Sequence, residues 1–176
     1  MILPRRQRIL RTASKEHIMR KLAIAISTVA SALMAALIAA TPAAATPPSA
    51  VSGPETFTGA SATVVRTAGG NTIIANTLTG IIAGSFTGTF TADFTTIAHS
   101  SGQANDVHGT FTCTCSIAGR SGSVTFRFEG TGTPAATQLH AETIGATGGL
   151  VGLHSNVTVD IVGAAATYSG TAHFDS

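Results

Sequence analysis

From residue 86 onward the sequence alternates between apolar or small residues and polar residues, mostly threonine, and this two-residue period constrains the fold most. Successive side chains of a strand point to opposite faces, so the alternation gives each strand one dry and one wet face. That pattern is typical of antiparallel sheets, because parallel strands are usually buried on both faces. Threonine, valine, isoleucine and phenylalanine also favour strands. The clearest alternation covers residues 86–95, 110–117, 124–129 and 168–175.

Four weaker strands complete the pattern and bring the total to about eight. We place them at residues 56–66, 71–83, 137–146 and 153–162. On the dry face large and small residues alternate, as at Phe86 and Gly88, which suits the tapering interior of a small closed barrel. A two-sheet sandwich is the alternative. The sequence therefore predicts an all-β domain, an antiparallel barrel of about eight strands, with a core that includes Phe86, Phe90, Phe111, Phe126, Phe128 and Phe174.

Residues 1–45 are expected to be a signal peptide with a signal helix, and its anatomy is found in residues 19–45. Arg20 and Lys21 precede an apolar run over residues 22–40, and three alanines then end at Ala45. We expect cleavage between Ala45 and Thr46. An uncleaved anchor is the alternative, because about 20 apolar residues can span a bilayer.

Two further segments lie on either side of residues 19–45. Residues 1–18 precede a second methionine, Met19, and we interpret them as a mis-assigned start or a long basic region. Residues 46–54 are rich in proline, serine and alanine and predict a flexible leader, so the barrel domain is expected at 55–176. The expected location is secreted, extracellular or in the cell envelope, without membrane attachment after cleavage.

The charge of the exported part argues against nucleic acid as a partner. After Ala45 the sequence has three arginines, no lysine and seven acidic residues, a formal charge of 3 − 7 = −4. A protein that binds nucleic acid needs a basic face to neutralise phosphates. We therefore expect no nucleic-acid partner.

Several glycine-rich motifs resemble a bacterial secreted family of unknown function whose fold is similar to the allene oxide cyclase barrel, a calycin-like architecture. The motifs are SFTGTF at 85–90, AGRSGSVT at 118–125, ATGGLVGLH at 146–154 and YSGTAHFD at 168–175. The resemblance implies an eight-stranded barrel with a small interior and implies no established activity. In the third motif we expect Leu150 and Leu153 to plug one end of the barrel.

Cys113 and Cys115 depart from that family and share one face of a strand. Export permits a disulfide between them. Residues two apart on an extended strand, however, have Cα atoms about 6.6 Å apart, at the upper limit for a bridge. We therefore predict two buried free thiols, with a disulfide as the alternative if the strand bulges. No second Cys or His pair stands at zinc-site spacing, so no metal is expected.

His140 and Glu142 also lie two apart and share one face of the sixth strand. If that face points inward, a carboxylate beside an imidazole in a dry interior suits proton transfer, which makes the pair catalytic candidates. If it points outward, both are ordinary solvated residues. The alternation at 137–146 is too irregular to decide, and we favour the outward orientation.

Three hypotheses for function follow. The first is a non-catalytic module that holds a small apolar ligand, since eight-stranded barrels can enclose one small molecule. The second is an allene oxide cyclase-like isomerase, suggested by the resemblance alone. The third is a cell-envelope or surface interaction protein acting through its threonine-rich exterior. We rank them first, third, second, so a non-enzyme is favoured, and we expect no cofactor. The candidate ligand-binding residues are those of the interior: Phe90, Phe111, Phe126, Phe128 and Tyr168.

Overall fold

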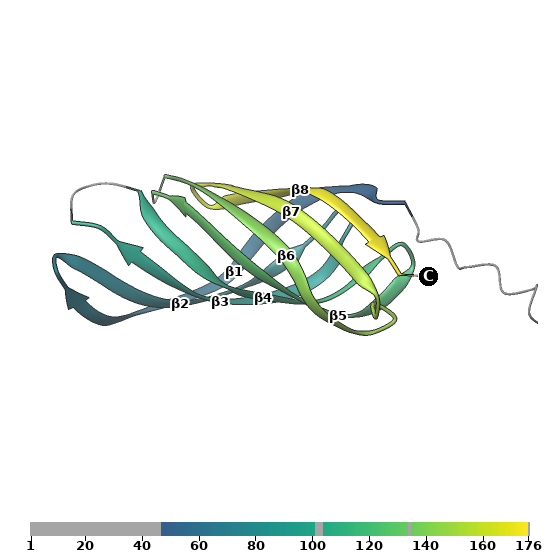
Figure 1. Cartoon of the computed structure of the whole chain (residues 1–176), viewed down its shortest axis with the longest axis horizontal. Helices are drawn as coiled ribbons and strands as arrows, with labels where there is room; N and C mark the ends of the chain where they lie inside the picture. The colour runs from purple at the N-terminus through teal and green to yellow at the C-terminus, as the bar shows by residue number, and fades with distance from the viewer. Residues whose placement is uncertain (1–46, 101–103, 134, 176) are drawn as a thin grey trace, which may run out of the picture. The chain divides into compact units, whose positions relative to one another are not determined.

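The structure is a computed structural model that describes residues 47–100, 104–133 and 135–175. In this part of the chain eight antiparallel strands follow one another around a closed barrel, and β8 pairs with β1 to complete the ring (Figure 1). The closed ring confirms the predicted all-β barrel and excludes the two-sheet sandwich. The strands are β1 (Ser49–Ala68), β2 (Asn71–Ile82), β3 (Thr87–Ala98), β4 (Asn105–Ile117), β5 (Arg120–Gly132), β6 (Ala136–Gly148), β7 (Leu153–Val162) and β8 (Ala165–Phe174).

The predicted signal peptide and its helix, residues 1–45, lie outside the described residues and remain a prediction. Within the described ranges, no helix is long and apolar enough to cross a bilayer.

The hairpin between β4 and β5 shows how the local sequence sets the register. Ala118 and Gly119 both have positive φ angles, 51° and 76°, and Ile117 pairs directly with Arg120. Two central residues with positive φ form the tight turn whose twist matches that of antiparallel strands. β4 and β5 are therefore joined by a tight two-residue hairpin, with glycine at one of the two left-handed positions.

The first strand begins earlier than predicted. We expected a flexible leader over residues 46–54, but β1 starts at Ser49 and pairs with β8 from Ser49 to Thr56. Val51 lies opposite Gly170 and is buried in the core. The leader prediction is wrong for residues 49–54 because a barrel needs its first strand to satisfy the free edge of its last. The composition of the segment did not show this requirement.

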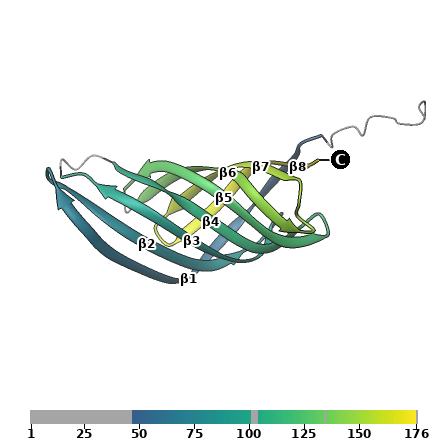
Figure 2. The ribbon, with the colours of Figure 1, turned by 60° about the horizontal axis from the view of Figure 1, so that its bottom comes forward.

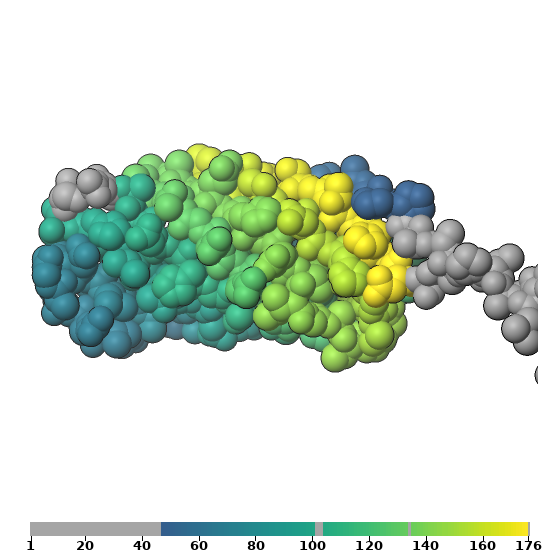
Figure 3. Space-filling view, viewed as in Figure 1, coloured from purple at the N-terminus to yellow at the C-terminus, as the bar shows by residue number. Residues whose placement is uncertain are grey.

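The predicted inward face is confirmed for the phenylalanines. Phe86, Phe90, Phe126 and Phe128 are buried, and the partly buried Phe111 and Phe174 pack against them. Glycines opposite large rings make the packing possible. Gly80 pairs with Phe90, and a Cβ atom at Gly80 would lie 2.5 Å from the tip of the Phe90 ring. In the space-filling view the atoms of neighbouring strands form a continuous wall on this side of the barrel (Figure 3).

Cys113 and Cys115 form a disulfide, so the prediction of two free thiols is wrong. Their Cα atoms are 5.5 Å apart, closer than in a flat strand and well within the range of about 4.4–6.8 Å that bridges span. The pairing of β4 with β3 and with β5 continues through both cysteines without a register shift. A local contraction of the strand, rather than the bulge that we had required, brings the sulfurs together.

We expect the folded protein to be two hydrogens lighter than the reduced chain by intact mass. Cys113 is 0% exposed and Cys115 5% exposed, so the bridge should resist reductant until the barrel unfolds. Alkylation should add no label in the native state or in denaturant alone, and two labels in denaturant with reductant. Two labels in denaturant alone would show free thiols and contradict the bridge.

Candidate functional site

The interior of the barrel contains a cavity of about 250 Å³. All five interior residues that the sequence predicted as ligand-binding candidates line it: Phe90, Phe111, Phe126, Phe128 and Tyr168. Other phenylalanine, leucine, valine and isoleucine side chains from the surrounding strands complete a mostly apolar wall. The volume lies just below the range of roughly 300–1,000 Å³ that is typical of small-molecule pockets.

One end of the barrel is filled by side chains. Leu150, in the turn between β6 and β7, is 0% exposed, and Leu153 is buried beside it in the core. The predicted plug by these two leucines is therefore confirmed. Phe86, between β2 and β3, packs edge-to-face on Phe126 and Tyr168 with ring centroids 5.9 and 5.8 Å apart. These contacts close the cavity at that end.

The cavity opens at the other end, where its lining becomes polar. Thr96 and Asn105 are half-buried at the facing ends of β3 and β4, and Thr133 is exposed beside the end of β5. The hairpin ends β3–β4, β5–β6 and β7–β8 gather at this end (Figure 2). The site is therefore a blind apolar pocket with an uncharged polar mouth.

Glu55 is the acidic side chain that lines this pocket, and sequence analysis did not select it. It extends inward from β1, opposite Ile82 of β2 and Ala166 of β8, and is only 9% exposed. Burial raises the pKa of its carboxyl from the ordinary value of 4.5 to about 7. At neutral pH this group therefore exists in both its neutral and its charged form, which is the condition for a buried functional acid.

Tyr168 lies close to Glu55 but its hydroxyl is already engaged. The hydroxyl donates to the carbonyl oxygen of Ala83 at 3.0 Å and accepts from the backbone N–H of Phe86 at 2.8 Å. Burial raises the pKa of this hydroxyl, and the charge of Glu55 adds to the increase, while the Phe86 N–H opposes it. Tyr168 therefore fastens the loop between β2 and β3 to the barrel and is not free to bind a ligand through its oxygen.

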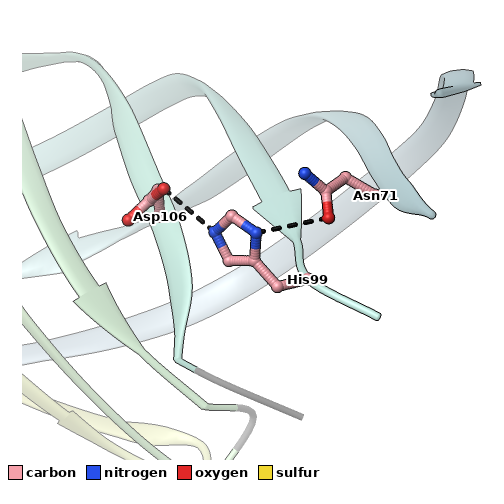
Figure 4. A network of polar contacts seen from close by, with 3 residues as sticks. All are labelled: Asn71, His99 and Asp106. Carbon is pink, nitrogen blue, oxygen red and sulfur yellow. Dashed lines mark hydrogen bonds and ion pairs between the residues drawn. The ribbon is translucent and has the colours of Figure 1, made fainter. Parts of the chain in front are cut away.

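A second polar group lies at the open end and was also missed (Figure 4). The His99 ring is held between Asp106 of β4, at 3.0 Å from Nε2 to Oδ2, and Asn71 of β2, at 3.4 Å from Nδ1 to Oδ1. His99 directly follows β3, so the three side chains tie the ends of three neighbouring strands. This arrangement stabilises the rim near the pocket mouth.

His140 and Glu142 lie on the outer face of the barrel. Their β6 neighbours Leu139 and Ala141 point inward and are buried. Glu142 forms an ion pair with Arg127 of β5, and His140 Nε2 lies 3.3 Å from the amide nitrogen of Asn156. The structure does not place the pair in the pocket, so their role as catalytic candidates is not supported. The outward orientation that we favoured agrees with this placement.

No metal site is formed by the side chains that the structure describes, since no three His, Cys, Asp or Glu residues there lie close enough to share an ion.

Among solved structures, a similar fold occurs in the crystal structure of a protein of unknown function from the DUF3224 family of Shewanella oneidensis MR-1. The two chains are 17% identical and superpose with a TM-score of 0.61 over 73% of this chain and 98% of that one. At this identity the likeness shows a shared fold and carries no activity. No family model and no curated protein sequence matches the chain.

Proposed function

We propose that this protein is an exported, non-catalytic module whose barrel holds one small apolar molecule. The observation that carries the proposal is the blind apolar pocket of about 250 Å³. An apolar ligand gains roughly 25 cal/mol for each Å² of surface that it removes from water. A pocket closed at one end, with little polar surface along its walls, offers this gain to a molecule that enters through the mouth.

Two features support an extracellular or envelope location. Residues 1–45 have the sequence pattern of a signal peptide. The bridge between Cys113 and Cys115 suits an oxidising compartment, because disulfides rarely persist in the cytosol. A ligand carrier outside the cytoplasm is consistent with both.

An allene oxide cyclase-like isomerase is the second candidate, favoured by the buried Glu55 in a dry cavity. A carboxyl whose pKa is about 7 can move a proton at neutral pH. Against it, Tyr168 is the other titratable group beside Glu55, and its hydroxyl is bound to backbone. A surface interaction protein gains no support from the pocket. We therefore place binding first.

The most direct test is native mass spectrometry of the protein purified from its own host. We expect one apolar molecule per chain, released when the barrel unfolds. A fluorescent apolar probe should then bind the emptied protein and be displaced by the released molecule. Recovery of that molecule in a chemically rearranged form after incubation would favour the isomerase instead.

Filling the pocket should weaken binding. Ala92 lines the cavity from β3, so Ala92→Phe should weaken binding of the apolar probe by at least about tenfold. Overpacking of this kind usually costs about 1–3 kcal/mol, which a stable barrel tolerates and a thermal melt would measure. Ala75→Phe is the matched control, because Ala75 is exposed on β2. Equal probe affinity of both folded variants would place the binding site outside the pocket and overturn the proposal.

A further inference from the structure

The unusual element of the pocket is a buried acid without a basic counterpart. In the described residues no side chain donates a hydrogen bond to Glu55 and no cation pairs with it. The three arginines of this part of the chain are all exposed. Arg127 is paired with Glu142 on the outer face, and Arg120 lies 4.1 Å above the Phe174 ring. The described residues therefore supply no cation to pair with an ionised Glu55.

Aromatic rings line the cavity that Glu55 also lines. Phe57, the next inward residue of β1, lines the same cavity and packs edge-to-face on Phe90 with centroids 6.3 Å apart. Tyr168 of β8 lies close enough for the charge of Glu55 to influence its pKa. Ring faces attract cations at up to about 6 Å, and more strongly where water is excluded. A carboxylate among aromatic rings suits an organic cation.

Other head groups fit less well. An anionic group would meet the like charge of Glu55, and the barrel domain as a whole is acidic, with three arginines against seven acidic residues after Ala45. A neutral group leaves the carboxylate without compensation whenever it ionises. An alkylamine, whose pKa is near the value of about 10.4 for lysine, is already an ammonium ion at neutral pH. On binding it pairs with the carboxylate of Glu55, and a Glu55 that carried a proton releases that proton to water. No net charge is then buried.

We propose that the molecule held in the barrel carries one basic nitrogen on a hydrocarbon body, with its ammonium against the carboxylate of Glu55 and its hydrocarbon extending toward the open end. This inference rests on the proposed binding function. The hydrocarbon would lie along Phe94 and Phe128, whose ring centroids are 6.0 Å apart, and Leu139. Thr96 and Asn105, which line the mouth, carry no charge, and the nearby Asp106 of the rim is already paired with His99.

The test compares three probes of one chain length: octylamine, octan-1-ol and octanoic acid, each titrated into the protein at neutral pH. We expect the amine to bind most tightly and the acid most weakly. Glu55→Gln should weaken octylamine binding by about tenfold to a hundredfold, the range for a lost charge-assisted hydrogen bond. The affinity for octan-1-ol should change by less than about threefold. Glu129→Gln, an exposed acid of β5, is the matched control and should leave all three affinities unchanged.

The outcomes separate the two proposals. If octan-1-ol binds but octylamine binds no more tightly, or if Glu55→Gln leaves the amine preference intact, the basic-nitrogen inference is overturned and the apolar-binding function stands. If Ala92→Phe weakens the binding of none of the three probes, binding occurs outside the pocket and both proposals fail. If none of the probes binds, both are also contradicted. Thermal melts of Glu55→Gln establish that the variant is folded.

Discussion

Phe126→Ala should lower the free energy of unfolding by about 3–5 kcal/mol. Phe126 is buried, and its ring packs edge-to-face on Phe111 at 5.8 Å and on Phe86 at 5.9 Å between centroids. Truncation removes both aromatic contacts and enlarges a space that the strands cannot fill, because the hydrogen-bonded ring of the barrel fixes their separation. The loss combines the transfer free energy of the ring with the cost of the enlarged cavity.

Urea unfolding followed by circular dichroism measures this loss. Ile144→Ala on β6 is the control, because Ile144 is 53% exposed and its truncation should cost no more than about 1 kcal/mol. A loss below about 1 kcal/mol for Phe126→Ala would mean that its ring faces solvent, and the inward and outward faces of β5 would have to be exchanged.

The strands that the sequence predicted best are those with an unbroken period. β3 and β4 pair along their length without a register shift, so every second residue keeps its face and the alternation gives the correct core. β1 is different because its pairing with β2 shifts between Phe57 and Gly59 and again between Val64 and Arg66. Each extra residue exchanges the inward and outward faces of the strand. The two-residue period of the sequence therefore did not show which residues of β1 point inward.

The missed acid has a different cause, because the first strand was predicted to begin at residue 56 and Glu55 lay just outside it. Glu55 precedes the first shift of β1 and stands at an inward position that a pattern argument reserves for apolar residues. On β6 a shift opposite Thr125 and Phe126 leaves Ile144 without a pairing partner on β5, and Ile144 is exposed like His140, which lies four residues before it. The disulfide was missed for another reason, since the expected Cα separation assumed an ideal flat strand. Local departures from an ideal strand limited the prediction at Ile144 and at the disulfide, and the misplaced start of β1 limited it at Glu55.

The stability of the protein should fall as the pH rises from about 4.5 to about 7, because of Glu55. Burial raises the pKa of this carboxyl, so the folded protein keeps its proton up to about pH 7. The unfolded chain releases the proton near the ordinary value of 4.5. Between these values the folded state binds more protons than the unfolded state, and the free energy of unfolding therefore decreases with pH. Above pH 7 both states are ionised and the contribution becomes constant.

The expected decrease is about 3 kcal/mol, since each unit of pKa difference corresponds to about 1.36 kcal/mol. Glu55→Gln cannot ionise, so the difference in unfolding free energy between variant and parent should grow by about this amount from pH 4 to pH 8. Taking that difference cancels the other titrating groups. Asp160→Asn is the control, because Asp160 is exposed on β7 and accepts a hydrogen bond from Gln138. If the difference in unfolding free energy between Glu55→Gln and the parent does not change with pH, water reaches the carboxylate. Glu55 would then not be buried in the closed end of the pocket.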